Sequence, residues 1–378
     1  MRPFRLSQSA RTLLKCKLFR QLTRSCGSIT DLRSKVAEAI ASNSLLFDKV
    51  TFERSTGTML EWVAEKDSVL SRIRTIKELK KRLANGRRCY ALRHKDFPAI
   101  PITFLHVALT HELAPSLSYL DEHCRETQDD SEGNFKPSCA MFYSVNAPHS
   151  ELSGLDLAPL IIKLALQDLM QEIPSIHYYS TLSPIPRFND WLSTDTVHSE
   201  EIVLSIPPNI MTALEETHDI MLNLCDDNDG NSSYKYTEEQ VLAISDLSEM
   251  KQYVSHITSN TDVEWVKDVN LSQSLRLPMS YLCAYYLMYE KRTDGAPFDP
   301  VARFHLRNGA QLRRINYLGN TSSIGLERSS GMMVNYLYTA PELNEDTLKH
   351  RAQIFDDTYA FRVHNQVLSL LTGDEHID

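Results

Sequence analysis

A strand, a long apolar helix and a second strand follow one another in the middle of the chain, and this run constrains the fold most. The helix is expected in "GLDLAPLIIKLALQDLMQEIP", where Pro159 suits the first turn, a broad apolar stripe follows, and Pro174 ends the helix. The flanking segments "CAMFYSVNA" and "IHYYSTLSPIP" are rich in aromatic or β-branched residues, as strands are. The length from Cys139 to Ser183 matches one crossover unit, which predicts a parallel pair of strands.

Similar segments extend the sheet on both sides of this run. "CYALRH" and "ITFLHVAL" precede it, and "AQLRRINYLG" and "GMMVNYLYT" near the C-terminus are also typical of strands, whereas "LPMSYLCAYYLMYEK" predicts a buried helix. The fold class is therefore α/β or α+β, a mixed sheet with helices. The expected organisation is a basic segment at residues 1–28, a short helical segment at 29–88, and a domain at 89–378 with an acid-rich helical insertion at about 191–271.

The first 28 residues differ in charge from the rest of the chain. "MRPFRLSQSARTLLKCKLFRQLTRSCGS" carries seven Arg or Lys residues among apolar residues and serines, and no acidic residue occurs before Asp31. This composition is typical of a mitochondrial transit peptide, so we expect import into the mitochondrial matrix. A basic surface helix or arm is the alternative, and with it a cytosolic location. The C-terminal "DEHID" is not a peroxisomal signal.

Charge and composition exclude two broad classes of protein. The net charge is −9, and no C2H2, RNP or helix-turn-helix pattern is present, which argues against general nucleic-acid binding. No run of about eighteen apolar residues predicts a membrane span. The seven cysteines never occur at Cys-x-x-Cys spacing, which predicts reduced thiols rather than a zinc ribbon or a redox motif.

Two sequences that begin like metal sites are incomplete. "HELAP" at His111 lacks the second histidine of a zincin and is expected to be a solvated turn. "CDDNDG" resembles an EF-hand loop, but Cys225 and Tyr236 stand where acidic ligands belong. We therefore predict no metal site. Glycine-rich nucleotide motifs and Gly-x-Ser-x-Gly are also absent.

"DPVARFHLRNGA" predicts a short helix that carries a histidine. Asp299 can cap the first amides, proline fits the first turn, and Gly309 can adopt the left-handed conformation that ends a helix. His305 shares a face with Phe304 and is expected to point inward near the helix C-terminus. The helix dipole favours an imidazolium there and burial disfavours it, so the pKa could shift either way. The alternative is a core histidine whose nitrogen is satisfied by a carbonyl.

Two loops follow strands at the edge of the sheet where ligands usually bind. The loop "SELSGLDLAP" leads into the long helix, whose first amides could face an anion such as a pyrophosphate. In "TLSPIP", Pro184 forces Ser183 into an extended conformation and Pro186 stiffens the exit. A rigid serine hydroxyl can orient a substrate, although a plain proline turn explains the same pattern. Together with His305, these loops are consistent with a small-molecule site.

Six longer segments resemble malonyl-CoA decarboxylases in the same order and at compatible spacing, from about Leu46 to about Leu371. They are "FLHVALT", "MFYS", "STLSPIPRFNDWL", "LCAYYLMYEK", "DPVARFHLRNGAQLRRINYLGN" and "GLERSSGMMVNYLY". The resemblance implies a fold like that of GNAT acetyltransferases. It also implies conversion of malonyl-CoA to acetyl-CoA and carbon dioxide, a role in fatty acid metabolism, and no cofactor, metal or nucleotide.

The resemblance also assigns residues. It implies that Ser183 and His305 are catalytic and contact the substrate, and it leaves open which of them delivers the final proton. A histidine suits this transfer because its reference pKa is near 6.5. The CoA-phosphate loop of the family corresponds to Ser153, Gly154, Leu155, Asp156, Leu157, Ala158 and Pro159.

The sequence departs from the family at two places. Ala158 and Pro159 stand where relatives commonly have Gly and Thr, and because proline has no amide hydrogen we expect weaker CoA binding. Relatives carry a long helical domain that supports oligomerisation, whereas only a short stretch precedes Leu46. Either this chain lacks the domain or the sequence is incomplete, so we expect a weakened homo-oligomer. An acyl-CoA acyltransferase and a non-catalytic malonyl-CoA-binding module are the alternative functions.

Overall fold

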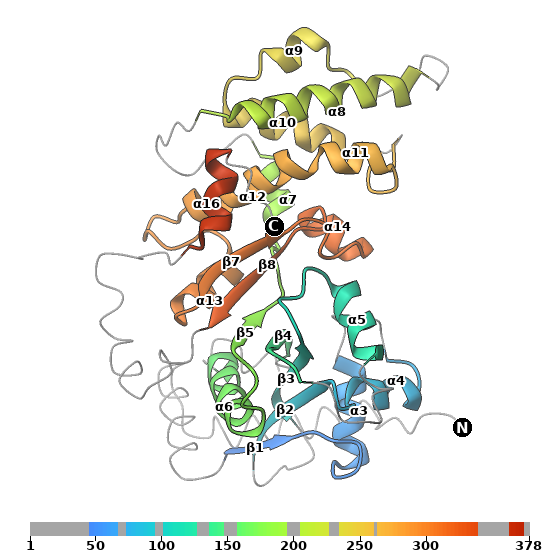
Figure 1. Cartoon of the computed structure of the whole chain (residues 1–378), viewed down its shortest axis with the longest axis vertical. Coiled ribbons are helices and arrows are strands. Elements are labelled where there is room, and N and C mark those ends of the chain that lie inside the picture. Colours follow the sequence, from blue (N-terminus) through green and yellow to red (C-terminus); the bar gives the residue numbers. More distant parts are fainter. Residues whose placement is uncertain are drawn as a thin grey trace, which may run out of the picture. The chain divides into compact units, whose positions relative to one another are not determined.

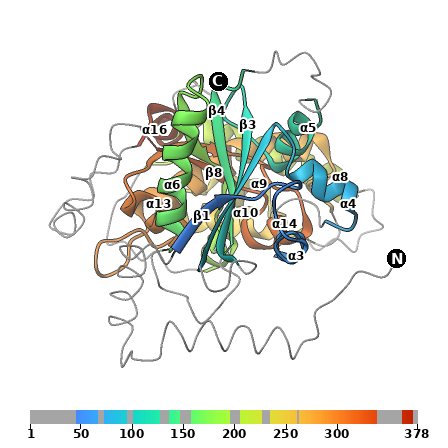
Figure 2. The same cartoon turned by 90° about the horizontal axis from the view of Figure 1, so that it is seen from below.

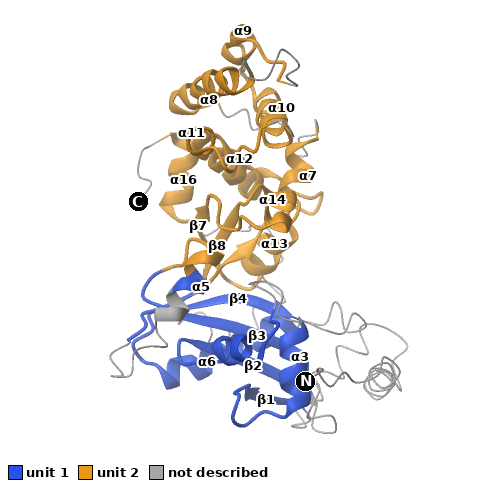
Figure 3. Ribbon diagram, turned by 90° about the vertical axis from the view of Figure 1, so that its right-hand side faces the viewer, with its two compact units in different colours: residues 1–112, 120–179 blue, residues 113–119, 180–378 orange. Residues whose placement is uncertain are grey.

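The computed structural model describes residues 45–66, 73–94, 101–126, 136–146, 157–194, 205–226, 234–260, 263–338 and 363–373. The transit peptide expected at residues 1–28 lies outside these residues. The chain divides into two compact units (Figure 3). Unit 1 comprises residues 1–112 and 120–179, and unit 2 comprises residues 113–119 and 180–378.

Unit 1 is built on four strands in the order β1-β2-β3-β4, and each neighbouring pair is antiparallel (Figure 1). Tyr90 pairs with Leu105 across β2 and β3, and Val107 pairs with Phe142 across β3 and β4. Helices flank the strands. The elements are β1 (Leu45–Lys49), α3 (Gly57–Lys66), α4 (Ile76–Arg82), β2 (Arg87–His94), β3 (Pro101–Thr110), most of α5 (Leu117–Glu126), β4 (Cys139–Asn146) and α6 (Leu157–Glu172).

Alternate residues of β2 meet helices on opposite sides of these strands. Cys89 and Ala91 join the core cluster that α3 and α4 form with Phe104. Tyr90 points to the other face, where its hydroxyl donates to Asp168 of α6 at 2.8 Å. Figure 2 shows α6 on one side of β1–β4 and α3 and α4 on the other. Helices cover both faces, so every residue of β3 is buried.

Strand β1 corrects the expectation that residues 29–88 are helical. Leu45–Lys49 pairs with β2, from Leu45 opposite His94 to Lys49 opposite Tyr90. Phe47 stacks on Tyr90 at 5.2 Å between ring centroids, and Asp48 forms an ion pair with Arg93. These cross-strand contacts, which a local helix could not make, select the strand. Helices α3 and α4 are present as expected, and they pack on the strands.

Unit 2 combines a short antiparallel sheet with many helices. β8 pairs with both β6 and β7. The last two residues of β5 (Tyr178–Thr181) belong to this unit. The other elements are β6 (Ser183–Pro184), α7 (Phe188–Leu192), α8 (Pro208–Asp226), α9 (Glu238–Leu242), α10 (Leu247–Thr258), α11 (Val269–Ser274), α12 (Arg276–Tyr289), α13 (Pro300–Arg307), β7 (Gln311–Asn316), α14 (Ser323–Ser329), β8 (Met333–Tyr338) and α16 (Asn365–Thr372).

Helix α12 is the core element of unit 2. Residues from Pro278 to Leu287 are all buried, as expected for a helix that is apolar on every side. Its Tyr286 contacts the rings of Phe188 and Trp191 from α7, with centroids 5.8 and 5.1 Å away. The aromatic "FNDW" sequence after the proline turn therefore docks β6 and its serine against the core.

Most sequence predictions for the elements are confirmed. The described part of residues 191–271 contains α8, α9, α10 and the start of α11, so this region is helical as expected, whereas its assignment as an insertion stays a prediction. The mixed α/β class is confirmed, whereas the parallel pair expected between residues 139 and 183 stays a prediction. No helix among the described residues has the length and hydropathy needed to cross a membrane.

Candidate active site

Ser183 opens the two-residue strand β6 and lies inside unit 2. The strand pairs with β8, with Ser183 opposite Val334 and Pro184 opposite Met333. The proline ring restricts the preceding residue to an extended backbone, as predicted. Only 5% of the Ser183 surface is exposed. The serine hydroxyl is therefore held in the protein interior by a rigid segment.

His305 lies on α13, whose two ends form as the sequence predicts. Asp299 caps the helix, since its carboxylate accepts from the amides of Val301 and Ala302 at 2.9 and 2.8 Å. Gly309 follows the helix with a φ of 81°, the left-handed conformation that glycine tolerates best. The cap and the stop fix the rotation of the helix, and His305 is 6% exposed.

Both ring nitrogens of His305 form hydrogen bonds with side-chain hydroxyl groups. Ser183 Oγ lies 3.0 Å from Nε2, and Tyr338 Oη lies 2.9 Å from Nδ1. Ser183 in turn donates to Thr181 Oγ1 at 2.9 Å. A core histidine satisfied by a carbonyl was the alternative for this residue, and it is wrong because the ring bonds side-chain hydroxyls. Such distances are suited to proton transfer.

Aromatic rings enclose the His305 imidazole, and the burial they cause favours its neutral form. Tyr336 stacks on it at 4.6 Å between centroids, and Phe304 meets it edge-on at 4.9 Å. Burial lowers the pKa of His305 to about 3, so the opposing effect of the helix dipole does not prevail. The sequence alone leaves the direction of this pKa shift open, and the structure shows that burial decides it, so the ring is neutral at pH 7.

The buried neutral histidine predicts a pH-dependent loss of stability. Its folded-state pKa of about 3 lies below the ordinary histidine pKa of about 6.5, so the unfolded chain binds more protons between these values. The stabilisation is present above pH 6.5 and is lost as the pH falls. From pH 7 to pH 5 we expect the wild-type free energy of unfolding to fall by about 2 kcal/mol relative to His305→Gln, measured by urea denaturation. Equal losses in both proteins would contradict the buried neutral state.

A second titratable group lies at the other end of α13. Burial raises the pKa of Asp299 to about 6, although the bonds from the Ala302 and Val301 amides act in the opposite direction. Its Oδ2 is buried and has no hydrogen-bond partner among the described residues. Asp299 is nevertheless ionised at pH 7, because its pKa remains below that pH. The negative charge lies at the helix N-terminus, where the dipole stabilises it.

Asn335 fixes the backbone beneath the serine and histidine. This fully buried residue accepts from Arg314 Nε at 3.1 Å and from Asn316 Nδ2 at 2.9 Å. It donates to the carbonyls of Ala114 and Thr181 at 3.1 and 2.8 Å. These contacts join several segments of unit 2 around one side chain, so the strand ends that carry the site have little freedom.

The predicted CoA-phosphate loop is described only in part. Ser153, Gly154, Leu155 and Asp156 lie outside the described residues. Leu157, Ala158 and Pro159 form the start of α6 in unit 1, with Leu157 buried and the other two half-buried. Pro159 thus lies in the first turn, as predicted, while Ser183 and His305 belong to unit 2. Of the predicted site residues, the structure brings Ser183 and His305 into contact.

Three further residues contact Ser183 or His305 and are not among the predicted site residues. Tyr336 and Tyr338 are two positions apart in "NYLYT", a spacing that puts both side chains on one face of a strand. Thr181 stands two residues before Ser183 in "TLSP", a spacing that again puts both side chains on one face. A spacing of two therefore predicts which side chains share a face of the strand, but it does not reveal which face lies against His305.

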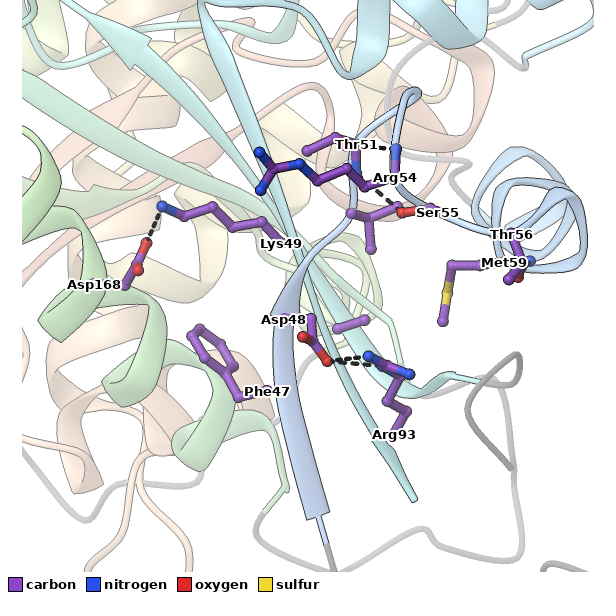
Figure 4. A pocket seen from close by; sticks show the side chains of 12 residues that line it. Phe47, Asp48, Lys49, Thr51, Arg54, Ser55, Thr56, Met59, Arg93 and Asp168 are labelled. Carbon is purple, nitrogen blue, oxygen red and sulfur yellow. Dashed lines mark hydrogen bonds and ion pairs between the residues drawn. The ribbon is translucent and has the colours of Figure 1, made fainter. Parts of the chain in front are cut away.

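A separate pocket of about 430 Å³ lies in unit 1 (Figure 4). Its charged side chains largely pair with one another: Lys49 with Asp168 at 2.9 Å and Arg93 with Asp48 at 2.6 Å. Arg54 and Thr51 also line the pocket and lie beside each other (Figure 4). None of the predicted site residues lines this pocket. Within the described part of the chain, no cluster of three or more His, Cys, Asp or Glu residues could hold a metal ion.

Comparison with known proteins gives consistent matches. The family model described as the malonyl-CoA decarboxylase C-terminal domain matches residues 45–357. A mitochondrial malonyl-CoA decarboxylase of Anser anser anser is 32% identical over 343 residues, which are 90% of this chain and 60% of that protein. The mitochondrial malonyl-CoA decarboxylase of Mus musculus is 30% identical over 84% of this chain and 58% of its own length. The chain thus spans less than two thirds of these relatives.

Two crystal structures of malonyl-CoA decarboxylases resemble the chain in fold. The protein from Agrobacterium vitis has a TM-score of 0.63 at 24% identity, over 95% of this chain and 76% of that one. The protein from Rhodopseudomonas palustris has a TM-score of 0.61 at 23% identity, over 96% and 72%. At such identities the likeness shows a common fold.

Proposed function

The chain belongs to the malonyl-CoA decarboxylase family, and we propose that it converts malonyl-CoA into acetyl-CoA and carbon dioxide. One observation carries this proposal: Ser183 and His305, 122 residues apart, lie 3.0 Å from each other in a buried site. By consuming malonyl-CoA the protein would act in fatty acid metabolism. The mitochondrial relatives and the basic segment at residues 1–28 also support a mitochondrial location, which cell fractionation can check.

The reaction needs little covalent chemistry from the protein. The bond between Cα and the carboxylate breaks, its electron pair forms the thioester enolate, and carbon dioxide leaves. One proton must then reach Cα. The site must therefore hold the carboxylate out of the thioester plane and deliver a proton without admitting water. The Ser183 hydroxyl, fixed on β6, is suited to orient the carboxylate.

The proton is supplied through His305. The imidazole is neutral in the free chain because burial lowers its pKa to about 3. A bound malonyl carboxylate places a negative charge in the same dry site, and an adjacent opposite charge raises the pKa of a histidine. His305 thus takes up a proton when substrate binds and passes it to Cα through the Ser183 hydroxyl. Each turnover consumes one proton, which balances the reaction.

The start of α6 is proposed to bind the CoA phosphates with the preceding loop from Ser153. The first amides of a helix suit an anion. Pro159 supplies no N–H in this first turn, and we therefore expect weaker CoA binding than in relatives with threonine at this position.

Product analysis tests the proposed function. The purified full chain is incubated with malonyl-CoA labelled with 13C at the free carboxyl group, with and without EDTA. We expect labelled carbon dioxide and unlabelled acetyl-CoA in equal amounts, and the same rate with the chelator. Acetyl transfer to an added amine without carbon dioxide would instead identify an acyltransferase. Binding of malonyl-CoA by a folded protein without turnover would identify a binding module.

A further inference from the structure

Thr181 is the fourth and last side chain of the hydrogen-bonded chain that starts at Tyr338. It ends β5 and is 2% exposed. Its Oγ1 accepts the Ser183 hydroxyl at 2.9 Å and the Tyr336 amide at 3.2 Å. The Thr181 carbonyl is held by Asn335 at 2.8 Å. Its hydroxyl oxygen is thus fixed from two directions beside the serine.

The contact with Thr181 determines where the protons of the site lie. A serine hydroxyl has one hydrogen, and in this structure Ser183 donates it to Thr181. Ser183 Oγ must then accept from His305, so the neutral imidazole carries its hydrogen on Nε2. Nδ1 is left without a hydrogen and accepts from the Tyr338 hydroxyl. The three hydrogen bonds among these four side chains run in one direction, from Tyr338 through His305 and Ser183 to Thr181.

We infer that Thr181 is a positioning residue for the decarboxylation: by accepting the Ser183 proton, it keeps the His305 tautomer with its hydrogen on Nε2 facing the serine. This inference rests on the proposed function of Ser183 and His305. The arrangement leaves the serine proton on a weak acceptor, from which it can turn to the substrate. When His305 takes up a proton at Nδ1 on substrate binding, its Nε2 hydrogen already points at Ser183 Oγ and replaces the serine proton in the same step, which leaves a neutral imidazole.

Removing the threonine oxygen should reverse this order. Without an acceptor at position 181, the Ser183 hydrogen bonds the imidazole instead, because a nitrogen lone pair is then the remaining partner that the structure places beside it. Nε2 becomes the acceptor and the imidazole hydrogen moves to Nδ1. The serine proton is then directed at His305 rather than at the substrate, and Nε2, the nitrogen that faces the serine, carries no hydrogen that could replace it.

Two variants of the full chain separate this role from a structural one. Thr181→Val keeps the shape of the side chain but removes the oxygen, and we expect kcat to fall by about 10- to 50-fold with KM changed by less than about threefold. Thr181→Ser restores the oxygen and should restore kcat to within about threefold of wild type. A loss of packing alone would affect the serine variant more, because it lacks the γ-methyl group.

Nitrogen-15 NMR of selectively labelled histidine gives a readout that does not depend on activity. His305 is identified by its absence from the spectrum of His305→Gln. We expect hydrogen on Nε2 in the wild type and in Thr181→Ser, and on Nδ1 in Thr181→Val. Hydrogen on Nδ1 in the wild type would overturn the inference even if no variant folds. So would an unchanged tautomer together with unchanged kcat in a folded Thr181→Val.

The two readouts also separate the inference from the function it rests on. A wild type that releases no carbon dioxide would refute the proposed decarboxylation, whatever the tautomer is. A wild type that turns over malonyl-CoA but carries the hydrogen on Nδ1 would retain the function and refute the role of Thr181. Thermal unfolding of each variant shows whether the lost acceptor for the buried Tyr336 amide has unfolded the chain.

Discussion

His305→Gln is expected to lower kcat for malonyl-CoA decarboxylation by about a thousandfold, with KM changed by less than about threefold. Glutamine retains a polar side chain but cannot take up and release a proton at neutral pH. The enolate left by carbon dioxide would have to wait for a proton from solvent, and the site is buried. Stopped assays of acetyl-CoA formation over a range of malonyl-CoA concentrations measure both constants.

His218→Gln provides a matched control for this substitution. His218 is also buried, with 2% of its surface exposed, and its Nδ1 bonds the hydroxyl of Tyr234 at 2.6 Å. It lies on α8, outside the proposed machinery, so the variant should lose stability without a comparable loss of kcat. A folded His305→Gln protein with near wild-type turnover would exclude His305 as the source of the proton.

Local signals in the sequence predicted the histidine helix correctly. The Asp299-Pro300 start and the Gly309 stop both act within a few residues, through a cap to Val301 and Ala302 and through a positive φ. Such signals need no distant partner. Helix α6 and the strands on both sides of it were predictable for the same reason, because their apolar patterns are long and regular.

Strand β1 shows where local reasoning fails. "LLFDK" follows a segment of helix-forming residues and is too short for its own period to be decisive. Its conformation depends on Tyr90 and Arg93, which lie more than forty residues later in the chain and provide the ring and the charge that Phe47 and Asp48 contact. Strand pairing of this kind is a tertiary contact, and the sequence of the segment alone does not predict it.

The sequence predicted the two principal residues of the candidate site, but it predicted neither the contact between them nor the protonation state of His305. The motif resemblance identified Ser183 and His305, and the hydrogen bond between them required the fold. The pKa of His305 depends on rings such as Tyr336, which stacks on it from a different element. The position of His305 near a helix end leaves the direction of that pKa shift open. Burial decides it, since desolvation is its principal cause.

Ser183→Ala is expected to lower kcat by about 100- to 1,000-fold, because it removes both the group that orients the malonyl carboxylate and the link between His305 and the carbon. Ser180→Ala is the matched control. Ser180 is fully buried on β5, the preceding strand in the chain, and its hydroxyl donates to the Tyr336 carbonyl at 3.1 Å instead of contacting His305. We expect this control to change stability with little effect on kcat.

The double variant Ser183→Ala/His305→Gln tests whether the two side chains act as one unit. If the proton passes from His305 through Ser183, loss of either residue breaks the same path, and adding His305→Gln to Ser183→Ala should reduce kcat by less than about threefold further. Multiplied effects of the two single substitutions would instead mean that each residue acts on the substrate independently. The 3.0 Å contact between Ser183 Oγ and His305 Nε2 favours the shared path.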